Sequence, residues 1–80
     1  MNPQDLLNRI TINPKILVGK PTIRGLRISV EQILYALAAG VPEDDLLKDY
    51  PELEAEDIRA ALAYAASIIA EEKVYPLQTA

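Results

Sequence analysis

The sequence predicts a small α+β fold, mainly α, in which a three-helix core follows a small antiparallel β-ribbon. Two short runs in the first half of the chain alternate polar and apolar residues as strands do, while apolar residues in the second half recur at helical spacing. Glycine and proline separate these segments. Because 80 residues, half of them apolar, suffice for one hydrophobic core, we expect a single domain over residues 9–73 with a tail over residues 74–80.

The predicted ribbon occupies residues 9–29. Residues 9–12 alternate polar and apolar side chains and stop at the turn signal Asn13-Pro14, and residues 26–30 show the same alternation. The two runs can therefore pair as antiparallel strands, with a long basic connection between them. Before the ribbon, residues 1–8 form either a flexible N-terminus or a short helix.

Helical spacing of apolar residues predicts three helices after the ribbon, over about residues 30–39, 43–50 and 55–72. Ser29 precedes the first helix and is followed three residues later by Gln32, a spacing typical of a helix N-terminus. Gly40 can end that helix in the left-handed conformation, and Pro42 suits the first turn of the next helix. The last two helices, joined by residues 51–54, have the outline of a helix-turn-helix module, although three short helices also make an ordinary bundle.

The third expected helix has a wide apolar face. Its stripe consists of six residues at helical spacing, namely Ile58, Ala61, Leu62, Ala65, Ala66 and Ile69. Six alanines from Ala60 to Ala70 allow another helix to approach closely, and Tyr64 and Ile68 widen the stripe. The extra width covers either the ribbon or a second copy of the chain. We expect a homodimer through this helix because small domains often gain core by dimerising.

The composition excludes several classes of function. With no histidine and no cysteine, the chain lacks the usual ligands of zinc, copper and iron and also the thiolate nucleophile. We therefore expect no catalytic residue, no metal site and no cofactor, and the protein is not expected to be an enzyme. A signal-peptide pattern and an apolar run long enough to span a membrane are both missing, which predicts a soluble, cytoplasmic protein.

Charge is distributed unevenly along the chain. Residues 1–40 carry five cations and two acids, a net +3, whereas residues 41–80 carry three cations and ten acids, a net −7. This asymmetry indicates two faces with different partners. The acids from Glu43 to Asp57 are interpreted as the solvated faces of two helices, placed favourably at helix N-termini.

Residues 19–29 are the most informative segment, because they are basic in an otherwise acidic chain. Gly19, Pro21 and Gly25 are expected to shape the turn into the second strand, since glycine permits positive φ and proline fixes φ. A phosphate-binding P-loop is rejected, because Pro14 stands where that motif needs glycine and Pro21 where it needs serine or threonine.

The three cations of this segment are the candidate partner- or nucleic-acid-binding residues: Lys20, Arg24 and Arg27. They are either solvated charges, with one arginine pairing to an acid of the second or third helix, or a contact surface. As a contact surface they could follow a phosphate backbone or dock into an acidic protein site. Against DNA, the third helix begins with acids such as Glu54 and Glu56, which repel phosphate.

A set of short motifs extends over residues 10–64: Gly19-Lys20-Pro21, Ile23-Arg24-Gly25, Arg27-Ile28, Gly40, Tyr50-Pro51, Leu53, Asp57-Ile58 and Ala60-Ala61-Leu62-Ala63-Tyr64. In order and spacing this set resembles a small bacterial family, the domain of unknown function 433. The resemblance implies a homeodomain-like three-helix core behind a small β-ribbon. It also implies a role as the antitoxin partner of a PIN-like ribonuclease toxin in two-gene modules.

Three positions depart from the family pattern. Leu26 replaces the usual threonine, and Val18 stands where the family often has a small residue. Glu54 replaces the threonine that would cap the third helix. Glutamate is not among the preferred N-cap residues, so the sequence predicts a weaker cap at this position.

The functional hypothesis is the antitoxin of a type II toxin–antitoxin pair, which neutralises a PIN-like ribonuclease by stoichiometric binding and autoregulates if it also binds operator DNA. The resemblance implies clustered carboxylates in such a toxin, and Arg24 or Arg27 could form bidentate pairs with them. The alternative is a stand-alone helix-turn-helix DNA-binding transcriptional regulator. A plain scaffold or oligomerisation module is the third reading.

Overall fold

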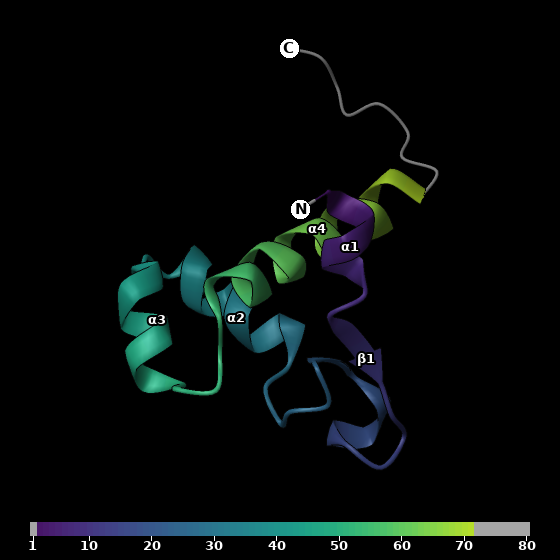
Figure 1. Ribbon diagram of the computed structural model, residues 1–80, viewed down its shortest axis with the longest axis horizontal. Helices are drawn as coiled ribbons and strands as arrows, with labels where there is room; N and C mark the ends of the chain where they lie inside the picture. The colour runs from purple at the N-terminus through teal and green to yellow at the C-terminus, as the bar shows by residue number, and fades with distance from the viewer. Residues whose placement is uncertain (1, 72–80) are drawn as a thin grey trace.

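The computed structural model describes residues 2–71 and has the predicted α+β, mainly helical architecture. The elements follow in the order α1 (Pro3–Leu7), β1 (Ile10–Ile12), a single turn η1 (Leu17–Gly19), β2 (Pro21–Ile23), α2 (Val30–Ala38), α3 (Glu43–Asp49) and α4 (Ala55–Glu71). Figure 1 shows α4 as the longest element, with α2 and α3 at one end and α1 and the ribbon at the other. Three helices therefore follow a small ribbon, and the expected tail at residues 74–80 lies outside the described residues.

The N-terminus has the short helix rather than a flexible segment. Asn2 caps α1, because its side-chain oxygen accepts a hydrogen bond from the Asp5 backbone N–H at 2.9 Å. Helix α1 packs against α4, as Figure 1 shows where the two helices cross. No helix in the described part of the chain is long and apolar enough to cross a membrane.

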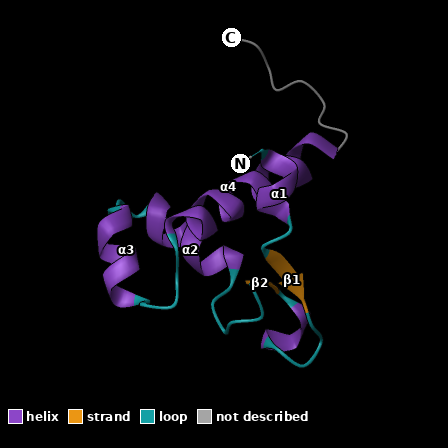
Figure 2. Ribbon diagram, in the orientation of Figure 1, coloured by secondary structure: helices purple, strands orange, loops and turns teal. Residues whose placement is uncertain are grey.

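The ribbon differs from the prediction in its second strand. Strand β1 pairs antiparallel with β2, with Thr11 opposite Thr22, so the expected strand over residues 26–30 is wrong (Figure 2). Of that segment, only Ser29 forms a bridge, to Thr22 on the other edge of β2. Strand β2 is therefore the middle of the ribbon, and the alternation over residues 26–30 marks the chain returning beside it.

A tight turn explains this arrangement. Arg24 and Gly25 both have positive φ, 46° and 74°, as the two central residues of a type I′ turn do. The turn is closed by the Leu26 N–H, which donates to the Ile23 carbonyl at 2.7 Å. The chain thus reverses directly after Ile23, and the Ile23 N–H then meets the Ile28 carbonyl at 3.1 Å.

Helix α2 begins and ends as the sequence predicts. The Ser29 hydroxyl accepts a hydrogen bond from the Gln32 N–H at 2.9 Å, which satisfies one of the free donors of the first turn. At the other end Gly40 has a φ of 89°, and the Val41 N–H donates to the Ala36 carbonyl at 3.0 Å. This is the Schellman pattern, in which glycine is favoured because the left-handed conformation crowds a Cβ atom.

The core lies where α2, α3 and the first half of α4 meet the ribbon. Its buried residues come from all of these elements and the loops between them: Ile23, Ile28, Val30, Ile33, Leu46, Leu53, Ile58 and Ala61. The predicted stripe of α4 is thus split, because Ile58 and Ala61 are buried whereas Leu62, Ala66 and Ile69 are exposed. The difference matters for function, since it leaves apolar surface on the second half of α4.

Candidate functional site

Of the three candidate cations, Arg24 is the most firmly held. Its Nε donates to Asp57 Oδ1 at 3.0 Å, and its Nη2 donates to Asp57 Oδ2 at 2.8 Å. The same Nη2 also donates to the Glu52 carbonyl at 2.7 Å. This bidentate geometry is the strong form of an arginine–carboxylate pair, and the hydrogen bond to Asp57 raises the pKa of Arg24. Arg24 therefore ties the ribbon to the start of α4.

Asp57 is the centre of this contact, and its side chain has no exposed surface. It receives two further hydrogen bonds, from Arg9 Nη1 at 3.0 Å and from the Glu54 backbone N–H at 2.8 Å. Burial alone would raise the pKa of the Asp57 carboxyl, but the hydrogen bonds from Arg24, Glu54 and Arg9 outweigh burial and lower it. Asp57 is consequently a buried, fully paired carboxylate.

The interpretation of the acids before and within α4 as solvated is therefore wrong for Asp57. Counted from Glu54 as the residue before the helix, Asp57 is the third helical residue, and its carboxylate accepts from the Glu54 N–H as in a capping box. The Glu54 side chain instead accepts from Arg9 Nη1 at 2.7 Å. The start of α4 is thus capped by Asp57 from inside the helix.

Lys20 and Arg27 lie elsewhere and are more exposed. Lys20 Nζ lies 3.1 Å from Glu31 Oε1, in a pair of which both side chains are more than half exposed. Such a pair contributes about 0–1 kcal/mol. Arg27 is exposed and makes no hydrogen bond or ion pair with any residue from 2 to 71. The structure therefore gives Lys20, Arg24 and Arg27 no common partner.

The tip of the ribbon has an unusual backbone. Three consecutive residues, Leu17, Val18 and Gly19, have positive φ, at 47°, 56° and 79°. Glycine tolerates this conformation, whereas a β-branched residue such as valine is rarely found in it. The Val18 side chain is also 95% exposed, so packing does not compensate for the backbone strain. The tip presents an apolar side chain to solvent, with Lys15 and Lys20 nearby in the chain.

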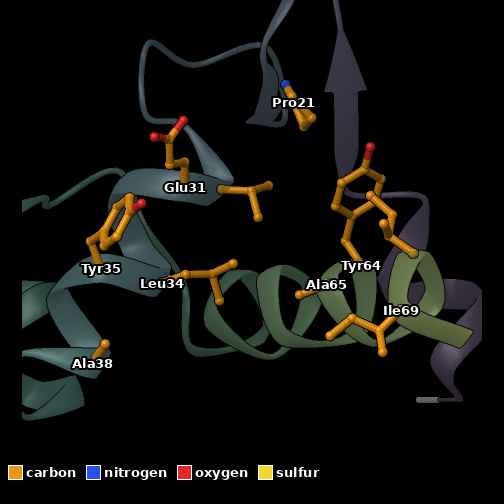
Figure 3. Close-up of a pocket in the computed structure, with 10 residues that line it drawn as sticks. Pro21, Glu31, Leu34, Tyr35, Ala38, Tyr64, Ala65 and Ile69 are labelled. Carbon is orange, nitrogen blue, oxygen red and sulfur yellow. The ribbon is translucent and has the colours of Figure 1, made fainter. Parts of the chain in front are cut away.

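A second feature is an open apolar groove between α2 and α4, with a volume of about 510 Å³. Ten residues line it: Pro21, Val30, Glu31, Leu34, Tyr35, Ala38, Tyr64, Ala65, Ile68 and Ile69. Figure 3 shows Leu34 and Tyr35 extending from α2, Ala65 and Ile69 on α4 across from them, and Pro21 of the ribbon above. Tyr35 is 69% exposed and Ile69 61%, so this apolar surface is open to solvent.

These features define a small α+β protein, mainly helical, with a strained ribbon tip and an open apolar groove. Residues 10–65, more than half of the chain, match a family described as "Protein of unknown function (DUF433)". The chain belongs to this family, as its ribbon and helix motifs predict.

Two relatives agree with this assignment. A crystal structure of a DUF433 member protein from Anabaena variabilis ATCC 29413 superposes with a TM-score of 0.73 at 37% identity, covering 85% of this chain and 67% of that one. The uncharacterized protein y4eO of Sinorhizobium fredii is 41% identical over 56 residues, which are 70% of this chain. The matched region is only 25% of y4eO, so the chain spans about a quarter of that relative's length.

The alternative that one arginine pairs with an acid of the third predicted helix is confirmed by Arg24 and Asp57, but sequence reasoning missed the second arginine, Arg9, and the residues that form the groove. Arg9 and Asp57 are separated by 48 positions, so no local pattern indicates their contact. The one available signal is the three-residue spacing between Glu54 and Asp57, which fits a capping arrangement. The groove had a clearer signal, because the apolar face of α4 is wider than one side of a small core requires.

Proposed function

We propose that this chain is the antitoxin of a two-gene toxin–antitoxin pair, which neutralises a PIN-like ribonuclease by binding it through the ribbon tip. The family resemblance supplies the class of partner. The observation that carries the proposal is Val18, a 95% exposed valine held at a φ of 56°. Backbone strain of this kind is concentrated at functional sites and ligand clamps.

Val18 suits a contact with a protein partner, because its exposed side chain gains no packing within the described chain. A non-glycine residue in the left-handed conformation costs about 1–2 kcal/mol, and solvent-exposed valine recovers none of it through packing. A partner that buries this side chain gains roughly 1.5–3 kcal/mol of hydrophobic free energy. The rigid turn also keeps the side chain in place before binding, which lowers the entropy lost on association.

Two exposed cations, one before and one after β2, suit an acidic protein surface. Arg27 has no partner within residues 2–71, and the exposed Lys20–Glu31 pair is weak enough to be exchanged. Both can therefore contact the clustered carboxylates that the resemblance implies for a PIN-type nuclease. Arg24 is assigned a different role, since its hydrogen bonds to Asp57 and Glu52 already occupy it. It positions the turn that presents the ribbon.

Relative y4eO carries the matching region within a longer chain. The region that matches this chain makes up only 25% of y4eO, so the same fold occurs there joined to much additional sequence. Stoichiometric binding, rather than turnover, is the mechanism we assign to this chain.

DNA binding without a toxin, the alternative function, is less well supported. In a helix-turn-helix the second helix enters the major groove with its N-terminus, where cations contact phosphate. Two cations at the start of α4, Arg9 and Arg24, are hydrogen-bonded to Asp57. The exposed Arg59 on α4 lies 3.8 Å from Glu56. The exposed Glu54 and Glu52 remain on that surface, and they repel phosphate.

Co-expression with the product of the adjacent gene tests the proposal. We expect the two proteins to purify together, and Val18→Glu or Arg27→Glu to weaken the complex about tenfold or more, because each places a carboxylate against an acidic surface. Lys48→Glu is the matched control, since Lys48 is an exposed cation on α3, away from the ribbon. Equal affinities for all three variants would contradict the assignment to the ribbon tip.

Inhibition gives a second readout. The purified neighbour should cleave RNA, and an equimolar amount of this chain should suppress that activity. Arg24→Ala is unsuitable for this assay, because it also removes the main partner of buried Asp57 and so destabilises the fold. A neighbour with no ribonuclease activity, combined with tight binding of the chain to a DNA fragment from upstream of the genes, would favour the transcriptional regulator instead.

A further inference from the structure

Helix α4 continues an apolar stripe beyond the core of the domain. Ile58 and Ala61 are buried, whereas Ala65 of the same stripe and Ile68 beside it line the open groove. The spacing of these four positions alternates between three and four, which is the pattern of a helix that packs against another helix along its length. In the described structure the first half of this seam is covered and the second half is not.

The groove has the shape to receive a helix. Its two walls are α2 and α4, and apart from Glu31 every residue that lines it is apolar or tyrosine. Figure 3 shows the small side chain of Ala65 between the longer side chains of Leu34 and Ile69. Small residues let a second helix approach closely, and longer ones at the rim can pack around it.

The distribution of charge is compatible with a second copy of the chain as the occupant of the groove. The chain carries a net charge of −4, so two copies repel each other over most of their surface. From Ala60 to Ala70, however, α4 has no charged residue. The carboxylate of Glu31 at the rim is paired with Lys20. The groove and residues 60–70 of α4 are thus a surface on which two copies can meet without facing like charges.

We propose that a second copy of the chain occupies this groove. The second half of α4 from one copy lies between α2 and α4 of the other, and the same contact is repeated by two-fold symmetry. The two α2–α4 pairs then form a four-helix arrangement that buries Tyr35, Ile68 and Ile69 of both copies. An antiparallel orientation of the two α4 helices places their dipoles favourably.

This arrangement leaves the ribbon tip available. Val18 and Arg27 do not line the groove, since Val18 lies at the ribbon tip and Arg27 lies in the segment between β2 and α2. A dimer through the groove would therefore carry two ribbons for two partner molecules. The proposal does not depend on the identity of that partner, and it is tested on the isolated chain.

The mass of the full chain in solution tests the proposal. At about 50 μM the wild-type chain should have twice its mass of 8.8 kDa, a concentration within the affinity range of small interfaces. Ile69→Glu should weaken the dimer about a hundredfold, because two carboxylates become buried per dimer. Leu62→Glu is the matched control: Leu62 is an exposed residue of the same helix that does not line the groove, and its variant should remain dimeric.

Cross-linking provides an independent measurement. The chain contains no cysteine, so single substitutions give unambiguous products. Ile68→Cys should form a covalent dimer with a short bis-maleimide, whereas Leu62→Cys should not. Circular dichroism of each variant checks that its helices are intact.

Two results would overturn the proposal. One is a wild-type chain that stays monomeric at about 50 μM, the concentration at which the dimer is expected. The other is an Ile69→Glu variant that dimerises as well as Leu62→Glu. If the chain is monomeric and Ile69→Glu abolishes co-purification with the adjacent gene product, the groove belongs to that partner instead.

Discussion

The two halves of α4 differ in which side chains they bury. In the first half, the buried residue with the most demanding chemistry is Asp57, a carboxylate with no exposed surface and hydrogen bonds from Arg24, Arg9 and a backbone N–H. In the second half no residue is buried and none from Ala63 to Ala70 is charged, although isoleucines occur there. The helix buries a charge at one end and exposes hydrocarbon at the other.

In the first half of α4 the fold supplies hydrogen-bond partners for a buried charge, whereas in the second half it leaves apolar side chains exposed. Asp57 is costly to bury, and the chain supplies every hydrogen bond that offsets the cost. Burial of Ile69 would be favourable, yet the side chain is 61% exposed. Residue type alone would predict an exposed aspartate and a buried isoleucine. The fully paired charge has a structural role, whereas the exposed isoleucine is the residue that the proposed dimer would bury.

Removing the charge should have the largest effect. Asp57→Ala leaves Arg24 without a carboxylate, leaves Arg9 paired with Glu54 alone, and removes the acceptor of the Glu54 N–H. Deleting one partner of a buried ion pair costs about 3–5 kcal/mol, and we expect the lower end because Arg9 and Arg24 can regain some water. Urea denaturation measures the loss in the free energy of unfolding. Asp57→Asn is the control that keeps an acceptor oxygen, and it should lose clearly less.

If Asp57→Ala and an exposed substitution such as Asp49→Ala cost the same, the carboxylate is not the structural centre described here. The first half of α4 would then not depend on its buried carboxylate. Asp49 suits this control because it is exposed and lies on neighbouring α3.

Truncating an isoleucine should lower the free energy of unfolding much more in the first half of α4 than in the second. Ile58 has no exposed surface, so Ile58→Ala should cost about 2–5 kcal/mol through lost burial and the cavity left behind. Ile69 is 61% exposed, so Ile69→Ala should change the stability of the monomer by less than about 0.5 kcal/mol. Thermal and urea unfolding at low protein concentration compare the two. Equal losses would show that both halves of α4 are core.

The pH dependence of stability isolates the ion pair from the packing around it. Because the pKa of Asp57 is lower in the folded protein than its ordinary value of 3.8, the carboxylate stabilises the fold above pH 3.8. This contribution is lost as the pH falls through the lowered pKa of the folded state. Asp57→Asn should therefore show a shallower loss of stability below pH 3.8 than the wild type. Parallel acid-unfolding curves would contradict the assignment.

Local signals predicted the helices, because their determinants lie close together in the sequence. Ser29 and Gln32, three residues apart, define the start of α2, and Gly40 defines its end through its own backbone. The same locality explains the error in the ribbon. Alternation at residues 26–30 was visible, but the left-handed turn at Arg24 that makes β2 the middle strand was not.

The site could be predicted only in part, because its contacts are long-range. Arg24 belongs to a basic segment that is visible in the sequence, yet its partner lies 33 positions away. An arginine that reaches a buried carboxylate and an arginine that faces solvent, such as Arg27, have identical local signatures. Only the fold decides which one is available to a partner.

The ribbon tip extends the comparison to a residue that the fold holds under strain. Val18→Gly should stabilise the isolated chain by up to about 1 kcal/mol, since glycine relieves the left-handed strain but has more entropy when unfolded. The same substitution should weaken the complex with the adjacent gene product, because it removes the exposed side chain. Ile12→Gly is the control: Ile12 is an exposed residue of β1 without positive φ, and its replacement should destabilise the chain by about 0.5–1 kcal/mol. A residue whose removal improves the free protein and harms the complex is kept for its partner, whereas loss of both would place Val18 among the residues that hold the ribbon together.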